Sequence, residues 1–523
     1  MKTNFTILLR ITNFFTRGKS IVSIMLFILL GLSVQANNIQ LSNVSLQSQN
    51  TSQHSYLVQF DLSWDNSWAS ASSANLHDAA WIIIKYRLAN EFVWHHATLH
   101  WVDGTGSADG HIVPTGAAIS SSQDNIGGAH GVFVYHSSAM TQGSVNYSGV
   151  QLRWDYGVDG VGDNDLVEIS VYGIEMVYVT KGAYYLGTGK IGGNGFEFYT
   201  LDNSSNHAPY LVNSEGQISI SNSAGSLFYN YLSTGGGPVY AGDESGPLPS
   251  SYPKGYNAFY CMKYEISQQQ YVDFLNNIAT PNNRYGASSS GSRYGISLNT
   301  INNEYETTSP YIACGFLSGD DILSYLHWAA LRPMTELEYE KACRGGASAV
   351  LNEFAWGNSL KAFNTYSISN SDATDEAISA NYRTTAGNAI YSLTYSTGPV
   401  RCGIFAANSA NNNSSNYYGR MRSGATYYGI MEMSGNIAEF VVSVGDSDSR
   451  NFNGLEGNGN LDLSSKYTFG NWPDTKLVYR GGSFADNVAK MQITNRTGAY
   501  NGGLTDYTAR VNNHGGRGVR LAP

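Results

Sequence analysis

The chain has 523 residues, of which only 13% are charged, and its formal net charge is −10. Proteins that bind nucleic acids concentrate lysine and arginine on one surface, because these side chains displace the counterions of the phosphate backbone. No basic stripe occurs in this sequence, and we expect no nucleic-acid partner. The length is sufficient for two or more domains of ordinary size.

The first 36 residues have the pattern of an export signal. Four basic residues precede an apolar run from Ile21 to Val34, and the small-residue pattern Val34-Gln-Ala36 ends it. This order is typical of a secretory signal peptide cleaved after Ala36, with an uncleaved amino-terminal anchor as the alternative. No later stretch approaches the ~20 apolar residues that a membrane-spanning helix needs. We expect a secreted, periplasmic or cell-surface protein that begins near Asn37.

Residues 37–173 have the pattern of an all-β domain. Apolar and polar side chains alternate from Val58 to Trp64, which is the period-2 signal of a half-buried strand. The same pattern recurs, between clusters of Gly, Asn, Ser and Asp, in residues 81–86, 131–135, 150–154 and 167–171. Several short strands joined by such turns favour an antiparallel sandwich.

Two features of this region suggest metal sites, and we interpret both as structural. His96 and His100 share one face of a predicted strand beside His95, but a metal centre needs three or four converging ligands. The loop from Asp159 to Asp165 is rich in oxygen ligands that suit Ca²⁺, yet it fits no twelve-residue calcium loop. Hydrogen-bonded histidines and a plain turn explain these residues.

Residues 174–523 contain three predicted helices and a polar insertion. Ser267 with Gln270, and Thr335 with Glu338, form capping boxes at the start of two of the helices. Between them, residues 320–329 carry apolar side chains at i, i+3, i+4 and i+7, which indicates a core-facing helix. Residues 188–252 are rich in Gly, Ser and Asn, and we interpret them as a long surface loop with a hairpin near residues 217–220.

Three glutamates in the last of these helices resemble an acid–base group. Residues two apart on a helix point in different directions, and we predict that no two of Glu336, Glu338 and Glu340 share a face. Capping and structural hydrogen bonds are therefore their expected roles. The four cysteines, at positions 261, 314, 343 and 402, allow three pairings, among which the sequence does not decide.

Several segments together resemble a known family. They are Met176–Gly187, Leu331–Gly346, Met431-Glu-Met-Ser-Gly-Asn-Ile-Ala-Glu439-Phe, Arg480-Gly-Gly-Ser-Phe484 and Gly516-Arg-Gly-Val-Arg520. This set is similar to the signature of the sulfatase-modifying-factor family, which includes the formylglycine-generating enzymes. The resemblance implies the loop-rich α+β fold shared with C-type lectins for residues 174–523, behind the β-sandwich-like domain.

The resemblance also implies where the family's chemistry would lie. Catalytic members bind copper through two cysteines after the Gly-Gly-Ser, and Asp486 and Met491 stand at these positions. Cu(I) selects thiolates, which a carboxylate and a thioether do not replace, and no cysteine follows Cys402. The related non-haem-iron branch needs a histidine triad, for which residues 174–523 offer only His207, His327 and His514. We expect neither copper nor catalysis.

A structural calcium ion is the cofactor that the resemblance implies. Carried over by position, its ligands are the side chains of Glu432 and Glu439 and the carbonyl oxygens of Gly435 and Ile437, a hard-oxygen set. In the alternative, Asn436 and Glu439 satisfy buried backbone groups. A second calcium site of the relatives begins at a segment that Ala380-Asn-Tyr382 resembles, and it stays open.

The sequence therefore predicts an exported, non-catalytic member of this family that serves as a binding or structural scaffold of the cell envelope. One alternative is a formylglycine-generating oxidase that acts on a sulfatase cysteine. Another is a ligand-binding protein whose segment Asn487–Asn513 is diversified by a retroelement. The partner is an envelope or extracellular protein, peptide or glycan that the sequence does not identify.

Overall fold

The computed structural model describes residues 38–523, apart from residues 72–75, 90, 103–109, 125–126, 190–196, 203, 205, 230, 233–237, 240–241, 287–290, 407–416, 470, 474–475 and 503–507. The predicted signal peptide, residues 1–36, lies outside the described residues. Within the described part of the chain, no helix has the length and apolar character needed to cross a membrane.

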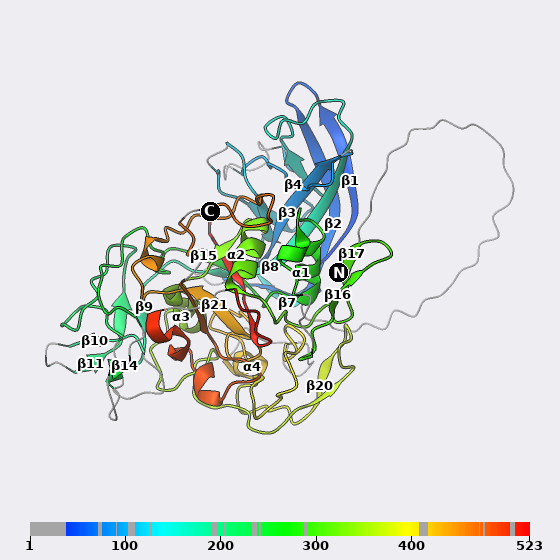
Figure 1. Cartoon of the computed structure of the whole chain (residues 1–523). Coiled ribbons are helices and arrows are strands. Elements are labelled where there is room, and N and C mark those ends of the chain that lie inside the picture. The colour runs from blue at the N-terminus through cyan, green and yellow to red at the C-terminus, as the bar shows by residue number, and fades with distance from the viewer. Residues whose placement is uncertain are drawn as a thin grey trace, which may run out of the picture.

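One eight-stranded sheet connects the two parts of the molecule (Figure 1). Its order is β18-β24-β15-β8-β3-β6-β5, and β4 also pairs with β3. The amino-terminal part contributes β3 (Asp78–Leu88), β4 (His95–His96), β5 (Ala117–Ser120) and β6 (Val132–His136). The carboxyl-terminal part contributes β15 (Phe259–Met262), β18 (Arg332–Pro333) and β24 (Gly518–Leu521). Between them lies β8 (Val167–Val179), which pairs with both β3 and β15.

A second, three-stranded sheet packs on one face of the amino-terminal strands. It consists of β1 (Gln40–Asn50), β2 (Ser55–Ala69) and β7 (Met140–Trp154) in the order β1-β2-β7. Val58 and Phe60 of β2 and Leu152 of β7 share a buried cluster with Ile82 and Ile84 of β3. The strands predicted from alternation are therefore confirmed, and their apolar faces form the core between two sheets.

The opposite face of β3 packs against the carboxyl-terminal part. Trp81 belongs to the largest buried cluster of the molecule, and its Nε1 donates to the carbonyl of Ala329 at 2.9 Å. Lys85 is also buried, and its Nζ donates to the carbonyl of Trp328 at 2.8 Å. Because β3 is buried on both faces, the two parts share a hydrophobic core. The predicted boundary at residue 173 falls within β8, and the division into domains stays a prediction.

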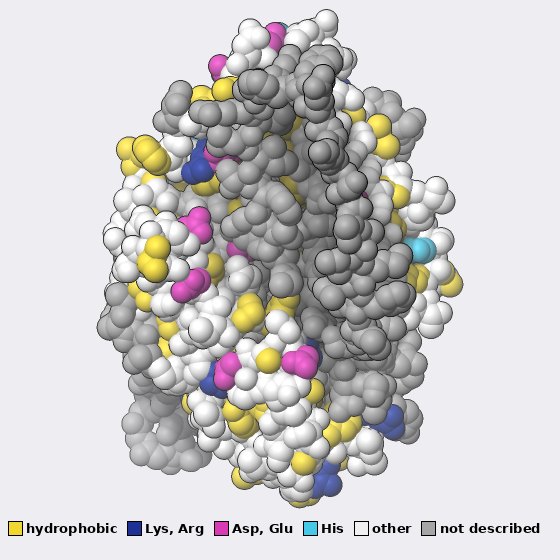
Figure 2. All heavy atoms as spheres, turned by 90° about the vertical axis from the view of Figure 1, so that its right-hand side faces the viewer, with side chains coloured by type: hydrophobic (Ala, Val, Ile, Leu, Met, Phe, Trp, Pro, Cys, Tyr) yellow, Lys and Arg dark blue, Asp and Glu magenta, His cyan; other side chains and the backbone are white. Residues whose placement is uncertain are grey.

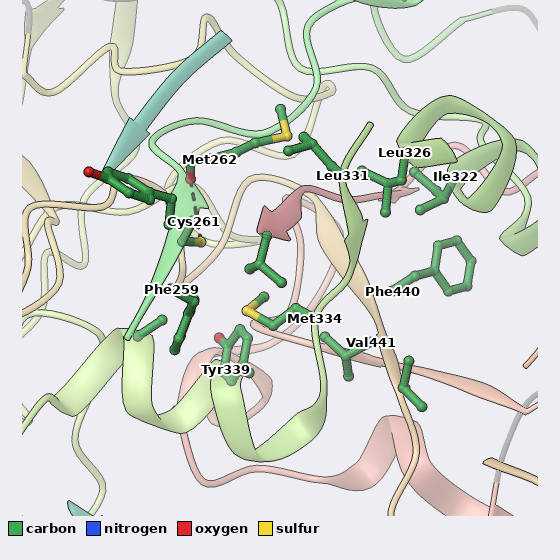
Figure 3. Packing of buried hydrophobic residues seen from close by; sticks show 14 of the residues in the cluster. Phe259, Cys261, Met262, Ile322, Leu326, Leu331, Met334, Tyr339, Phe440 and Val441 are labelled. Atoms are coloured by element: carbon green, nitrogen blue, oxygen red, sulfur yellow. Dashed lines mark hydrogen bonds between the residues drawn. The ribbon is translucent and has the colours of Figure 1, made fainter. Parts of the chain in front are cut away.

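The predicted helices are confirmed, together with their caps. Helix α1 (Gln268–Leu275) begins at the Ser267 capping box and α3 (Glu336–Arg344) at the Thr335 capping box. Helix α2 (Gly319–Trp328) has a third capping box, between Ser318 and Asp321, which the sequence analysis did not identify. Figure 3 shows how side chains of α2 and α3 meet those of β15 and β21 (Ala438–Val442) in the core. A fourth helix, α4, spans Tyr417–Ser423.

The glutamates of α3 have the structural roles that the sequence predicts, but their expected directions need one correction. Glu336 and Glu340 both reach the guanidinium group of Arg480, at 3.5 and 2.9 Å, while Glu338 binds Arg332 at 2.7 Å. The prediction that no two of them share a face is therefore wrong for Glu336 and Glu340, because residues four apart lie on the same side of a helix. All three are buried and act as partners of buried arginines.

The insertion is not a plain surface loop, which corrects a second expectation. Phe198, Leu227 and Tyr229 belong to the main hydrophobic cluster, and Ile218 and Ile220 pair through isolated bridges to Leu248 and Leu227 instead of forming a hairpin together. Its short strands, with the adjoining β9, are β9 (Tyr184–Leu186), β10 (Thr200–Leu201), β11 (His207–Ala208), β12 (Tyr210–Val212), β13 (Tyr231–Leu232) and β14 (Pro238–Val239).

The remaining elements are short and connect the core segments. The strands are β16 (Ile296–Asn299), β17 (Glu304–Thr307), β19 (Ser367–Ser369), β20 (Ala377–Ala380), β22 (Leu477–Arg480) and β23 (His514–Gly515). The 3₁₀ turns are η1 (Pro281–Asn283), η2 (Ser449–Asn451), η3 (Val488–Met491) and η4 (Thr497–Gly502). All four cysteines are buried and free, so none of the three possible pairings forms.

Candidate functional site

Two of the family-like segments, Met431–Phe440 and Arg480–Phe484, lie against each other around a small sheet, and we call them the two motif loops. Strand β21 pairs with β22 on one side and with β23 on the other. The loop before β21 donates from Gly435 N–H to the carbonyl of Gly481, and Phe484 N–H donates back to Asn436, both at 2.9 Å. Gly435 has a φ of 93°, and a Cβ there would lie 2.3 Å from the carbonyl oxygen of Ile390, so only glycine fits.

Glu439 is held by an arginine from the end of the chain. Nε and Nη2 of Arg517 donate to its two carboxylate oxygens at 2.7 and 2.9 Å, and both residues are buried. Arg517 also donates to the carbonyl of Met431 at 2.8 Å. Burial raises the pKa of Glu439 above its ordinary value, and the charge of Arg517 limits the rise. The bidentate pair fixes the carboxyl terminus to the first motif loop.

Two further glutamates lie buried beside this pair. Glu265 accepts from Ile437 N–H at 2.9 Å and from Asn436 Nδ2 at 2.5 Å, whereas Glu432 accepts from Gly403 N–H at 2.9 Å. The other carboxylate oxygen of Glu432, Oε2, has no hydrogen-bond partner among the described residues. Burial raises the pKa of Glu432 to about 8, and it raises that of Glu265, with a further contribution from Glu432.

The predicted calcium ligands fit a cation only in part. The unpartnered oxygen of Glu432 is an oxygen ligand of the kind that Ca²⁺ prefers, and Glu439 lies on the adjoining strand. Both oxygens of Glu439, however, accept hydrogen bonds from Arg517. Among the residues that the structure describes, no group of three or more His, Cys, Asp or Glu side chains is placed to hold a metal ion. At the second candidate segment, Asn381 donates to the carbonyl of Thr365 at 2.6 Å.

Asp486 and Met491 lie in different surroundings. Asp486 accepts from Ser483 Oγ and from Lys490 Nζ, each at 2.6 Å, and Ser483 Oγ also accepts from Asn513 Nδ2 at 2.8 Å. Met491 is fully buried in a cluster that contains Trp356 and other apolar side chains. The first position thus carries an ion pair, and the second forms part of a hydrophobic core.

The three histidines of residues 174–523 lie in three separate elements of the structure. His327 lies in α2, with its ring 4.7 Å from that of Phe469 and 5.3 Å from that of Trp472. His207 of β11 stacks on Tyr199 at 4.0 Å, and His514 belongs to β23. In the first part, His100 pairs with Asp155 at 2.7 Å, and Asp159 accepts from Thr98 Oγ1 at 2.6 Å. His100 and Asp159 are thus engaged in polar contacts, and His207 and His327 in contacts with aromatic rings.

The sequence analysis did not identify Glu265 and Arg517 as parts of this site. Both lie in segments that were noted for other reasons, Glu265 just before the α1 capping box and Arg517 in the closing Gly-Arg-Gly. The sequence feature that could have identified both is a charged residue at the end of an apolar strand. Such a residue predicts a buried partner, because Glu and Arg are almost never fully buried unless they are paired.

The comparison with protein-family models agrees with this architecture. The model of the sulfatase-modifying factor enzyme 1-like domain matches residues 225–508, which are more than half of the chain. The match covers both motif loops, α1 to α4 and the segment with Asp486 and Met491. No curated protein shows a significant match. The chain therefore belongs to the family of sulfatase-modifying factor enzyme 1-like proteins.

Proposed function

We propose that this protein is an exported, non-catalytic family member that serves as a binding or structural scaffold of the cell envelope. The observation that carries the proposal is the environment of Asp486, one of the two predicted copper-binding positions, which accepts from Ser483 Oγ and Lys490 Nζ. A carboxylate neutralised by an ammonium group is a poor ligand for Cu(I), which selects soft sulfur donors. Met491 offers one thioether, and it is enclosed in the core.

The remaining cysteines do not supply the missing ligands. Burial raises the pKa of Cys261 to about 12, and it also raises the pKa values of the other three thiols, Cys314, Cys343 and Cys402. The thiolate is the form that binds metals and attacks substrates, so buried thiols of this kind are inert. The four side chains serve as small apolar core residues.

Copper binding tests this proposal. We expect purified mature protein, titrated anaerobically with Cu(I) against a chromogenic chelator, to take up no stoichiometric copper. A double variant with Asp486→Cys and Met491→Cys places a thiol at each of the two positions and serves as the comparison. Stoichiometric uptake by the wild type would support the alternative oxidase function, in which the chain acts on a sulfatase cysteine.

Export is the second element of the proposal. The pattern of residues 1–36 supports it, and amino-terminal sequencing of protein recovered from a secreting host would begin at Asn37 if cleavage follows Ala36. A mature chain that begins at Met1 would contradict it. In the coloured part of the face drawn in Figure 2, a few acidic and basic side chains, some of them adjacent to each other, lie among hydrophobic and uncharged ones.

A structural calcium ion at Glu432, Gly435, Ile437 and Glu439 is a further proposal. The unpartnered oxygen of Glu432 supports it, and the hydrogen bonds from Arg517 to Glu439 weigh against it. Calorimetric titration of metal-free protein with Ca²⁺ is the test, with Glu432→Gln as the variant. If Ca²⁺ gives no heat and a chelator leaves the melting temperature unchanged, Glu432 serves the fold without a metal.

Buried residues limit how many positions of Asn487–Asn513 could vary, as the alternative of a diversified ligand-binding segment requires. Ile493, Thr494 and Ala499 are buried, and Arg496 pairs with the buried Glu336. Such positions tolerate few side chains, so variation would be confined to the exposed residues between them. Sequencing of genomic copies of this segment decides the question, and uniform copies would remove the alternative.

A further inference from the structure

Three charged side chains from three neighbouring strands meet in the interior of the molecule. Asp78 begins β3, Glu175 lies in β8, and Lys263 directly follows β15. Strand β8 lies between the other two strands (Figure 1). The backbone N–H of Lys263 donates to the carbonyl of Glu175 at 2.9 Å, which continues the pairing of β15 with β8. The three side chains therefore join the amino-terminal part of the chain to the carboxyl-terminal part.

The amino group of Lys263 contacts both carboxylates. Its Nζ lies 2.9 Å from Oδ2 of Asp78 and 3.2 Å from Oε2 of Glu175, and all three side chains are only 1% exposed. The carbonyl of Asn66 accepts a third hydrogen bond from this amino group at 3.1 Å. The other oxygen of Glu175, Oε1, has no hydrogen-bond partner among the described residues. A lysine amine and an aspartate carboxyl group thus face each other in a closed, buried site.

The carboxylate of Asp78 is held in one orientation. Its Oδ1 accepts from Ser67 Oγ at 2.8 Å and from Trp68 N–H at 3.0 Å, both near the end of β2. Its Oδ2 faces Lys263 and also accepts a longer bond from Trp64 Nε1, at 3.3 Å. Two donors on one oxygen stabilise the negative charge that develops there when a nucleophile adds to the carboxyl carbon. Oδ1 is therefore placed to remain, and Oδ2 is placed to leave.

Glu175 has the properties of a proton shuttle. Burial raises the pKa of Glu175 to about 7, although the charge of Lys263 opposes this rise. A carboxyl group with a pKa near neutrality both takes and gives a proton readily. Burial lowers the pKa of Lys263, but the charge of Asp78 and of its other neighbours outweighs burial and holds that pKa above its ordinary value. The amine therefore rests as an ammonium ion and must first give up a proton.

We propose that Lys263 and Asp78 join in an isopeptide bond that the folded protein forms by itself. One proton of the ammonium group passes to Oδ2 of Asp78, and the neutral amine then adds to Cγ. Glu175 takes a second proton from Nζ and gives it to Oδ2, which leaves as water. One N–C bond forms, one C–O bond breaks, and Glu175 returns to its starting state. An ammonium group and a carboxylate thus become one amide and one water molecule.

The interior of the protein favours the amide over the ion pair. Two charges taken out of water lose hydration that their mutual attraction repays only in part. The amide carries no charge, and its N–H has the carbonyl of Asn66 and Oε2 of Glu175 as nearby acceptors. Asp78 and Lys263 are 185 positions apart, so the bond closes a long loop and restricts the unfolded chain. This inference goes beyond the proposed function and does not depend on it.

Two other lysines of the chain serve as internal controls. Lys85 is also buried, but its Nζ donates to the backbone carbonyls of Trp328 and Gly459, at 2.8 and 2.6 Å. Lys490 contacts Asp486 at 2.6 Å, but its side chain is 38% exposed, and water solvates its charge. We expect both lysines to remain free, because each lacks one of the conditions that Lys263 meets.

Mass spectrometry of the purified mature chain tests the proposal. We expect the intact mass to lie below the mass calculated from the sequence by one water molecule. Digestion with trypsin should give a branched peptide in which the segment with Asp78 is joined to the segment with Lys263. The peptides that contain Lys85 and Lys490 should be linear.

Two variants separate the nucleophile from the proton shuttle. Lys263→Arg keeps a positive charge between the carboxylates, but a guanidinium group does not lose its proton in proteins, so this variant should have the full mass. Glu175→Gln keeps the shape of the side chain and cannot carry the proton, and most of the purified variant should also have the full mass. Circular dichroism of both variants verifies that they are folded.

Two results for the folded wild-type protein would overturn the proposal. The first is the full mass with Lys263 in a linear peptide, which would make the three charges an ordinary buried ion-pair group. The second is a loss of water located elsewhere in the chain, such as a succinimide at another aspartate. Complete crosslinking in folded Glu175→Gln would overturn the role of Glu175. Copper uptake is measured separately, so failure of either proposal leaves the other standing.

Discussion

Glu439 lies in β21 and Asp486 follows β22, the strand that pairs with β21, yet the two charges are neutralised in different ways. Glu439 and its partner Arg517 are both buried, and the pair is bidentate. Asp486 pairs with Lys490, whose side chain is 38% exposed. Removing one member of a buried pair leaves an unpaired charge in a medium of low dielectric constant, whereas water screens a charge at the surface. Loss of one member of the first pair is therefore expected to cost more stability than loss of one member of the second.

Buried arginine–carboxylate pairs recur throughout the family domain. They join Arg332 to Glu338, Arg344 to Glu353, Arg480 to Glu340, Arg496 to Glu336 and Arg517 to Glu439. Three of these pairs, those of Arg480, Arg496 and Arg517, connect segments far apart in the sequence, and the other two are local. The two positions predicted for the copper ligands carry instead an ion pair, between Asp486 and Lys490, and a core methionine, Met491.

Loss of the buried arginine is expected to have the largest effect. Arg517→Met leaves Glu439 unpaired in the interior and should lower the free energy of unfolding by about 3–5 kcal/mol. Urea denaturation followed by circular dichroism measures the change. The double variant Arg517→Met with Glu439→Leu removes both charges and should recover most of the loss. A single-variant effect under about 1 kcal/mol would show that water or a cation reaches Glu439.

The buried His327 is expected to make the stability of the protein depend on pH below neutrality. Burial lowers the pKa of His327 to about 3, with further contributions from Lys85 and His130, against about 6.5 in an unfolded chain. The unfolded chain therefore gains a proton that the folded chain refuses, so the stability present above pH 6.5 falls as the pH decreases towards 3.

The variant His327→Phe isolates this effect. It keeps an aromatic ring against Phe469 and Trp472 and has no proton to gain. Relative to this variant, the wild type is expected to lose about 1.4 kcal/mol for each pH unit between 6 and 4. Urea denaturation at several pH values measures both proteins. A constant difference between them would contradict a neutral buried His327.

Loss of a helix cap is expected to have an intermediate effect. Thr335→Ala removes the hydroxyl that accepts from Glu338 N–H at 3.1 Å, and about 1 kcal/mol of stability should be lost. Thr335→Ser keeps the oxygen and serves as the control. Thermal unfolding of the two variants distinguishes the cap from a packing effect, since equal losses would point to the methyl group.

The surface pair should matter least. Lys490→Ala leaves Asp486, whose side chain is 11% exposed, with its hydrogen bond from Ser483, so the unfolding free energy should change by only about 1 kcal/mol. Chemical denaturation at low and high salt measures the effect, which should shrink further at high salt. A loss of unfolding free energy as large as that of Arg517→Met would mean that the Asp486–Lys490 and Glu439–Arg517 pairs contribute equally to stability.

Local patterns in the sequence predicted local structure well. The capping boxes at Ser267 and Thr335 and the alternation of β2 depend on neighbouring residues, and the structure has each of them. The same reasoning failed for Glu336 and Glu340, because a two-residue spacing was applied to positions that lie four apart. It also missed the buried residues of the insertion, whose apolar side chains are too sparse to give a periodic signal.

Long-range partners were beyond a single sequence. Arg517, the partner of Glu439, lies just before β24, the last strand. Strand β8 pairs with strands of both parts of the chain. No periodicity specifies which arginine meets which glutamate, since that depends on the packing of distant segments.

Oxidation of a cysteine peptide tests the central claim most directly. Wild-type protein and the variant with Asp486→Cys and Met491→Cys are incubated with Cu(I), oxygen and a peptide carrying a sulfatase-type cysteine, and the peptide mass is followed. The account predicts that the wild-type protein leaves the cysteine unchanged. Conversion of that cysteine to formylglycine by the wild-type protein would contradict the account.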